Sequence, residues 1–138
     1  MDAPGRSLAP VSAGRDSPAA AAGMPLFVVA DQLAEKLLTD LLEHPLSGQA
    51  ARLPGFERIR LAGTEWTVVR PAAGAEVRGL LYRGLGAEDY RRLDAYWGVS
   101  EGLYRRLPVT VSVGSGSASS EETALTYLPT AKTLRRYR

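Results

Sequence analysis

Residues whose side chains could do acid–base chemistry gather in one short stretch, Arg92–Arg106. Its carboxylates are Asp94 and Glu101, and a positioned carboxylate can take a proton from an amine or return one to a leaving group. Asp94 is also of the type that hydrogen-bonds near a helix end without doing chemistry, and a glutamate in a turn is more often simply solvated. Trp97, at the centre of the stretch, has no acid–base capacity near neutral pH.

The same stretch is predicted to form a corner between a helix and a strand. Leu93, Tyr96 and Trp97 are spaced i, i+3, i+4 and therefore share one helix face. Gly98 stands where the helix should stop, because glycine adopts the left-handed cap conformation without strain. A strand rich in valine and tyrosine begins at Leu103. We expect such a corner to project side chains into the mouth of a sheet.

Apolar periodicity in the rest of the chain predicts a mixed sheet with few helices. A leucine stripe predicts one further helix, over 33–42, which Asp31 can cap. Strands are predicted at 26–30, 51–61, 64–70, 76–83, 103–113 and 122–128, with 71–75 as a loop. Because helices do not alternate strictly with strands, the pattern indicates the α+β class: a mixed sheet curled into a partial or closed barrel, with two main helices.

Composition divides the chain into an extension, one domain and a tail. Residues 1–23 are rich in Ala, Pro, Gly and Ser without periodicity, so we expect a disordered extension that adds nothing to stability, with Met24 as the natural start. Residues 24–130 should form the domain, and the basic tail 131–138 should fray.

Composition also excludes several kinds of site. The chain has no cysteine and a single histidine, His44, so neither a disulfide framework nor a His- or Cys-based metal site is expected, and no cofactor is indicated. The net charge of +2 with scattered arginines does not favour nucleic-acid binding. No apolar run is long enough to span a membrane, and the lack of cysteine suits the cytoplasm. The oligomeric state is left open.

Segments in matching order and spacing resemble the gamma-glutamylcyclotransferase-like family, which includes plant avirulence-induced members. The likeness spans about residues 25–128. Residues 26–29 are similar to the family's first strand, and residues 51–56 to its Ala-x-Leu-x-Gly-Tyr segment. Residues 76–82 are similar to its Val-x-Gly-x-Leu-Tyr strand, and residues 93–96 to its Leu-Asp-x-Tyr/Phe motif. Residues 103–106 are similar to its Tyr-x-Arg motif, and residues 123–128 to its closing strand.

The resemblance implies a reaction and a proton carrier. In such enzymes the α-amine of a γ-glutamyl group attacks its own γ-carbonyl, which gives 5-oxoproline and frees an amine. A glutamate directly after Leu-Asp-x-Tyr moves the protons, because an ammonium cannot attack until a base deprotonates it. Here the matching position is Trp97. In place of the family's Tyr-Gly-Thr-Leu loop, which holds the substrate, this chain has Val29, Ala30, Asp31 and Gln32. These four residues and Tyr104 are the expected substrate-binding residues.

These departures predict a family member without the standard activity, acting as a small-molecule-binding or regulatory module. Its partner would be a ligand of γ-glutamyl type, although Asp31 adds a charge that repels an anion. The alternative is an enzyme that releases 5-oxoproline from a γ-glutamyl amine, or acts on a related amide, with Glu101 as a displaced acid–base group. Trp97 could fill the former catalytic cavity or belong to the core, and Tyr104 could line the pocket or merely pack. Of the Arg105–Arg106 pair, one side chain is expected to be exposed.

Overall fold

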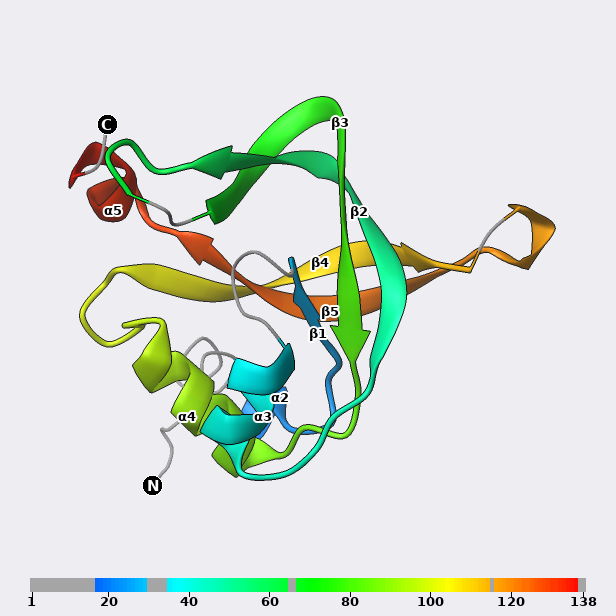
Figure 1. Ribbon diagram of the computed structural model, residues 1–138, viewed down its shortest axis with the longest axis horizontal. Coiled ribbons are helices and arrows are strands. Elements are labelled where there is room, and N and C mark those ends of the chain that lie inside the picture. Colours follow the sequence, from blue (N-terminus) through cyan, green and yellow to red (C-terminus); the bar gives the residue numbers. More distant parts are fainter. Residues whose placement is uncertain (1–16, 30–34, 65–66, 115, 137–138) are drawn as a thin grey trace, which may run out of the picture.

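The computed structural model describes residues 17–29, 35–64, 67–114 and 116–136, and these form a closed barrel with helices beside it (Figure 1). The strands are β1 (Leu26–Val28), β2 (Gly48–Arg60), β3 (Thr67–Tyr82), β4 (Tyr104–Val113) and β5 (Ser120–Pro129). The helices are α2 (Pro18–Ala21), α3 (Glu35–Leu42), α4 (Ala87–Tyr96), the 3-10 turn η1 (Gly116–Ala118) and α5 (Ala131–Arg136).

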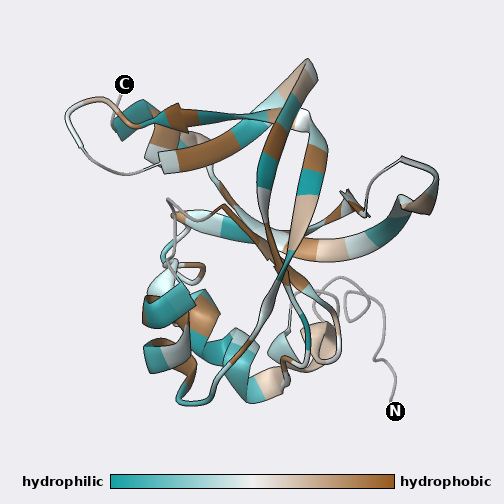
Figure 2. Ribbon diagram, turned by 45° about the vertical axis from the view of Figure 1, so that its right-hand side comes forward, coloured by the Kyte–Doolittle hydropathy of each residue, from teal (hydrophilic) through white to brown (hydrophobic). Residues whose placement is uncertain are grey.

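The barrel order is β1-β3-β2-β4-β5, and the predicted α+β class is confirmed. β1 pairs antiparallel with β3 and parallel with β5, which closes the sheet, and the other pairs are antiparallel. Helices α2, α3 and α4 lie together at one side of the barrel, and α5 lies near the opposite end (Figure 1). In Figure 2, apolar residues run along the strands at the centre of the molecule, while the helices carry polar and apolar residues together.

Strand β1 divides its side chains between two cores, because successive residues of a strand point to opposite faces. Leu26 and Val28 belong to the core between the barrel and the helices, whereas Phe27 and Val29 belong to the core inside the barrel. All are buried. The continuous apolar run therefore reflects a strand covered on both faces.

Strands β2 and β3 form the long bent ribbon of the barrel, and here one sequence expectation is wrong. The predicted loop 71–75 is part of a single strand, β3. Pairing passes from Pro54↔Glu76 to Phe56↔Pro71, so Gly55 alone lies opposite residues 72–75. Gly55 and Gly74 both have positive φ. The turn-forming residues thus produce a bulge that bends the ribbon without ending either strand.

The N-terminal segment is ordered in its last residues. Residues 1–23 were expected to be disordered, but 17–23 contain α2, and Ala21 is 3% exposed in the helix-side core. The Gly23 N–H donates to the Leu85 carbonyl at 2.9 Å. The expectation is therefore wrong for these residues, because the buried Ala21 side chain, the backbone hydrogen bond of Gly23 and a hydrogen bond from Arg106 Nη2 to the Ser17 carbonyl dock a single helical turn. The residues before them lie outside the described part.

The basic tail is also ordered where it is described. α5 occupies Ala131–Arg136, and residues 137–138 lie outside the described part. The Thr133 hydroxyl, on a residue 3% exposed, donates to the Leu103 carbonyl at 2.6 Å. The Thr130 hydroxyl donates to the Gly102 carbonyl at 2.6 Å. The expected fraying of 131–138 is thus wrong for α5, because two threonines anchor its start to the corner between α4 and β4.

Candidate functional site

The predicted corner is built by backbone hydrogen bonds that follow the end of α4. Trp97 is the C-cap residue, and its N–H donates to the Leu93 carbonyl at 2.9 Å. Gly98 has a φ of +67°, and a Cβ there would lie 2.8 Å from a Leu103 side-chain carbon. The Leu103 N–H donates back to the Gly98 carbonyl at 3.0 Å. The left-handed backbone favours glycine, so Gly98 sets the end of α4 directly after Trp97.

An aromatic cluster forms around Trp97. Its indole stacks on Tyr127 with 5.7 Å between ring centroids and 18° between planes. Tyr104 lies at 4.7 Å in a tilted arrangement, and Tyr96 at 5.3 Å edge to face. Trp97 is half-buried, and Tyr96 is 45% exposed. Such pairings hold rings in defined orientations, so Tyr96 and Trp97 at the end of α4 and Tyr104 of β4 form an aromatic surface that rests on the buried Tyr127 of β5.

A buried polar cluster supports that surface from behind. The Tyr127 hydroxyl donates to Asp94 Oδ1 at 2.6 Å, and Arg106 Nη1 donates to Asp94 Oδ2. The Arg106 side chain is 4% exposed, and its guanidinium also lies over the Tyr90 ring, 5.6 Å from the centroid. Burial, followed by the hydrogen bond to Asp94, raises the pKa of Tyr127, so its hydroxyl stays protonated and keeps donating.

This arrangement gives Asp94 and Arg106 structural roles. Asp94 was predicted to hydrogen-bond near the helix end, and it does so to Arg106 and Tyr127. Of the arginine pair, Arg105 is exposed, whereas Arg106 is buried against a carboxylate. A buried arginine requires such a partner. The contribution of Tyr127 was missed, because nothing local in β5 shows that this residue faces the corner.

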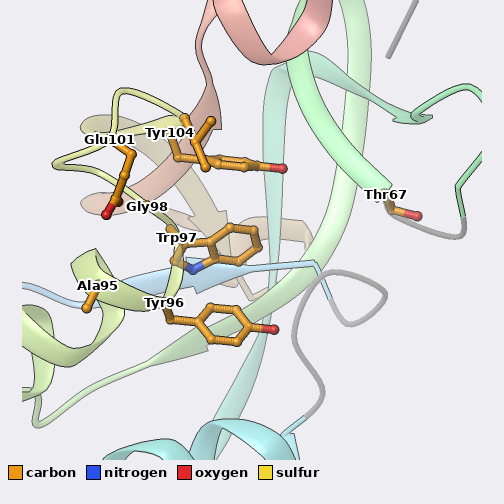
Figure 3. A pocket seen from close by; sticks show the side chains of 8 residues that line it. Thr67, Ala95, Tyr96, Trp97, Gly98, Glu101 and Tyr104 are labelled. Carbon is orange, nitrogen blue, oxygen red and sulfur yellow. The ribbon is translucent and has the colours of Figure 1, made fainter. Parts of the chain in front are cut away.

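A cavity of about 460 Å³ lies beside the aromatic cluster. Figure 3 shows the rings of Tyr96, Trp97 and Tyr104 projecting to the same side of the corner, with Thr67 of β3 across the cavity from them. The described residues that line it are Thr67, Ala95, Tyr96, Trp97, Gly98, Glu101, Leu103 and Tyr104. Trp97 therefore forms a wall of an open cavity, and it also packs against the helix-side core.

The predicted substrate-binding residues differ in their positions. Tyr104 lines the cavity. Val29 is 1% exposed in the core inside the barrel and is absent from the described lining. Ala30, Asp31 and Gln32 lie outside the described residues.

Glu101, the predicted displaced acid–base group, lies at the edge of the cavity. Its residue is exposed, and its backbone carbonyl accepts from Lys132 Nζ at 3.1 Å. In Figure 3 its carboxylate points away from the side on which the three rings project. It is the only ionisable carboxylate among the described lining residues.

Two kinds of feature are absent from the described residues. Within them, no group of three or more His, Cys, Asp and Glu side chains is placed to hold a metal ion. No helix in the described part is both long enough and apolar enough to cross a membrane.

Comparison with known proteins identifies the family. Residues 30–137 match the family model for gamma-glutamyl cyclotransferase, AIG2-like. No curated protein matches the sequence significantly.

Solved structures share the fold. The solution structure of the Arabidopsis thaliana protein At5g39720.1 superposes with a TM-score of 0.68 at 24% identity, covering 83% of this chain and 74% of that one. The solution structure of a second Arabidopsis thaliana protein, At3g28950.1, superposes with a TM-score of 0.66 at 20% identity, covering 83% of this chain and 67% of that one. The structure of a protein named gamma-glutamyl cyclotransferase superposes with a TM-score of 0.61 at 21% identity, covering 78% of this chain and 67% of that one. With the family model matching most of its length, the chain belongs to the AIG2-like gamma-glutamyl cyclotransferase family.

Proposed function

We propose that this protein binds a small molecule in the cavity beside Trp97 and lacks the standard cyclotransferase activity of its family. The observation that carries the proposal is the indole of Trp97, which stands, by resemblance in sequence, at the family's catalytic glutamate and forms a wall of the cavity. An indole N–H can donate a hydrogen bond but cannot accept a proton near neutral pH.

The missing base has a calculable cost. Ring closure to 5-oxoproline needs a group that deprotonates the attacking ammonium and then protonates the leaving amine. Removing a positioned general base typically costs a factor of about 10²–10⁴ in rate. Trp97 is also fixed in place by its contacts with Tyr104 and Tyr127, so it cannot swing aside to admit another base without breaking those contacts.

The loop that should hold the substrate is altered as well. The resemblance aligns Val29 with the tyrosine of the family's Tyr-Gly-Thr-Leu loop. Val29 has no hydroxyl, and its side chain is buried in the core inside the barrel. Its side chain therefore cannot donate to a substrate carboxylate, and a substrate that is not positioned reacts slowly even where a base is present.

A second candidate function is cyclotransfer, or another reaction on a γ-glutamyl amine or related amide, with Glu101 as acid–base group. Its support is that Glu101 borders the cavity. Against it, the residue is exposed and its carboxylate points away from the aromatic side of the cavity (Figure 3). Proton transfer needs heavy atoms about 2.6–3.2 Å apart, so Glu101 would have to change rotamer.

An assay of amine release and 5-oxoproline formation on a panel of γ-glutamyl amines separates the two functions. We expect no turnover by the wild-type protein. Glu121, exposed on β5 at the far hairpin, provides a matched control through Glu121→Gln. Turnover that Glu101→Gln abolishes and Glu121→Gln leaves intact would refute the binding-protein proposal and establish the second function. Trp97→Glu alone should not create activity, because Val29 would still fail to hold the substrate.

A further inference from the structure

We propose that the cavity beside Trp97 selects a cationic aromatic amine. This inference rests on the proposed function, because it names the ligand class of the same cavity. It follows from two properties of the described lining residues. They form a wall of aromatic rings, and they include one acidic side chain and no basic one.

The aromatic wall is pre-organised. Trp97 rests on Tyr127, whose hydroxyl is held by Asp94, and Asp94 is itself held by the buried Arg106. Because these contacts already fix the indole, a flat ligand that stacks beside it does not have to order the wall. Tyr96, which is 45% exposed, and Tyr104 extend the aromatic surface on either side of the indole (Figure 3).

The charge of the described lining residues disfavours anions. Of the described residues that line the cavity, Glu101 is negative at neutral pH, and none is Lys, Arg or His. Lys132 contacts the Glu101 carbonyl oxygen but is not part of that lining, and Arg106 lies behind Tyr127 in an ion pair with Asp94. A ligand carboxylate would therefore find no counter-charge among the described lining residues.

A positively charged ligand group is attracted both by the aromatic rings and by Glu101. The faces of tryptophan and tyrosine rings carry negative potential and attract ammonium groups, most strongly where water is partly excluded. The Glu101 carboxylate at the rim adds a weaker, screened attraction that needs no direct contact. A ligand that joins an aromatic ring to an ammonium group can use both features at once, the ring against Trp97 and the charge toward the ring faces and the rim.

Four probes separate the contributions of ring and charge. They are 2-phenylethylamine, 2-phenylethanol and 3-phenylpropionate, which share a phenyl ring but carry a positive, zero and negative charge, and ethylamine, which has the charge without the ring. Binding is followed by indole fluorescence of Trp97 in a Trp66→Phe background and by ligand-observed NMR. We expect 2-phenylethylamine to bind on the order of tenfold more tightly than 3-phenylpropionate, 2-phenylethanol to fall between them, and ethylamine not to bind measurably.

Variants test where the probe binds. Trp97→Leu should abolish binding of 2-phenylethylamine, as followed by NMR, while Trp97→Phe should retain much of it. Glu101→Gln should reduce the difference in affinity between 2-phenylethylamine and 3-phenylpropionate, whereas the control Glu121→Gln should leave that difference unchanged. The inference is overturned if 3-phenylpropionate binds as tightly as the amine, if ethylamine binds as tightly as 2-phenylethylamine, or if Trp97→Leu still binds the probe.

The test is independent of the proposed loss of cyclotransfer. Amine release from γ-glutamyl amines tests the missing activity, and probe titration tests the ligand class. Failure of the probes to bind, together with absence of turnover, would remove the aromatic-amine inference and leave the proposed function standing. Turnover on γ-glutamyl amines would refute the proposed function whatever the probes do.

Discussion

Removing the docked segment before Met24 should destabilise the protein, although composition alone predicts no effect. The segment makes a hydrogen bond from Arg106 Nη2 to the Ser17 carbonyl at 2.9 Å, and the Arg106 side chain is only 4% exposed. It also buries Ala21 and joins Gly23 to the carbonyl of Leu85.

The size of the effect follows from these contacts. Loss of a hydrogen bond from a buried charged donor costs about 1.5–3 kcal/mol, and loss of the backbone bond about 0.5–1.5 kcal/mol. Loss of the buried Ala21 methyl group, which leaves the surface it covered exposed to water, adds about 0.8 kcal/mol. The truncated chain no longer loses conformational entropy by ordering residues 17–23, which offsets much of the sum. We therefore expect a net loss of about 1–3 kcal/mol in the free energy of unfolding, the range of an ordinary destabilising change, seen as a fall of several degrees in Tm.

The assay compares two truncations, one that begins at Asp16 and one that begins at Met24, by chemical and thermal denaturation. The first keeps α2 and should match the full-length protein, as expected for an extension without apolar periodicity. The second should show the loss. If the two truncations unfold within about 0.5 kcal/mol of each other, a difference expected of a change that removes no packing, the docking of residues 17–23 contributes nothing and the reasoning fails.

Two further predictions concern single residues. The pKa of His44 is raised chiefly by its hydrogen bond to Asp89. The free energy of unfolding that this pair contributes should therefore be fully present below the ordinary histidine pKa of 6.5, and it should be lost as the pH rises through the higher pKa of His44 in the folded protein. The difference in unfolding free energy between wild type and His44→Gln should thus be larger at pH 5.5 than at pH 8.5, and a flat or reversed difference would contradict the assignment. Gly79→Ala should destabilise by about 1–3 kcal/mol, because its Cβ would lie 2.5 Å from the Val28 carbonyl oxygen. The loss is measured by chemical denaturation against the wild-type protein, and a change of less than about 0.5 kcal/mol, as expected where nothing is disturbed, would refute the clash.

Local signals in the sequence determined most of the elements. The apolar run in β1 reflects burial at the period of a strand, and the leucine stripe of α3 and the i, i+3, i+4 spacing before Gly98 place apolar side chains on one helix face, although Tyr96 is 45% exposed. They predicted the α+β barrel and the corner that carries Trp97. The family motifs added the position of the missing glutamate, because a motif records residue type at a fixed place along the chain.

Contacts between distant segments were decided only by the tertiary structure. The turn signal at 71–75 became a bulge because Gly55 on the partner strand bends with it. Docking of α2 depends on Arg106, which lies far along the chain from Ser17. The sequence determined that Trp97 stands at the corner. Whether its indole fills a cavity or borders one depends on Tyr127 and on the strand opposite, and no local pattern encodes how far apart two separately predicted elements come to rest.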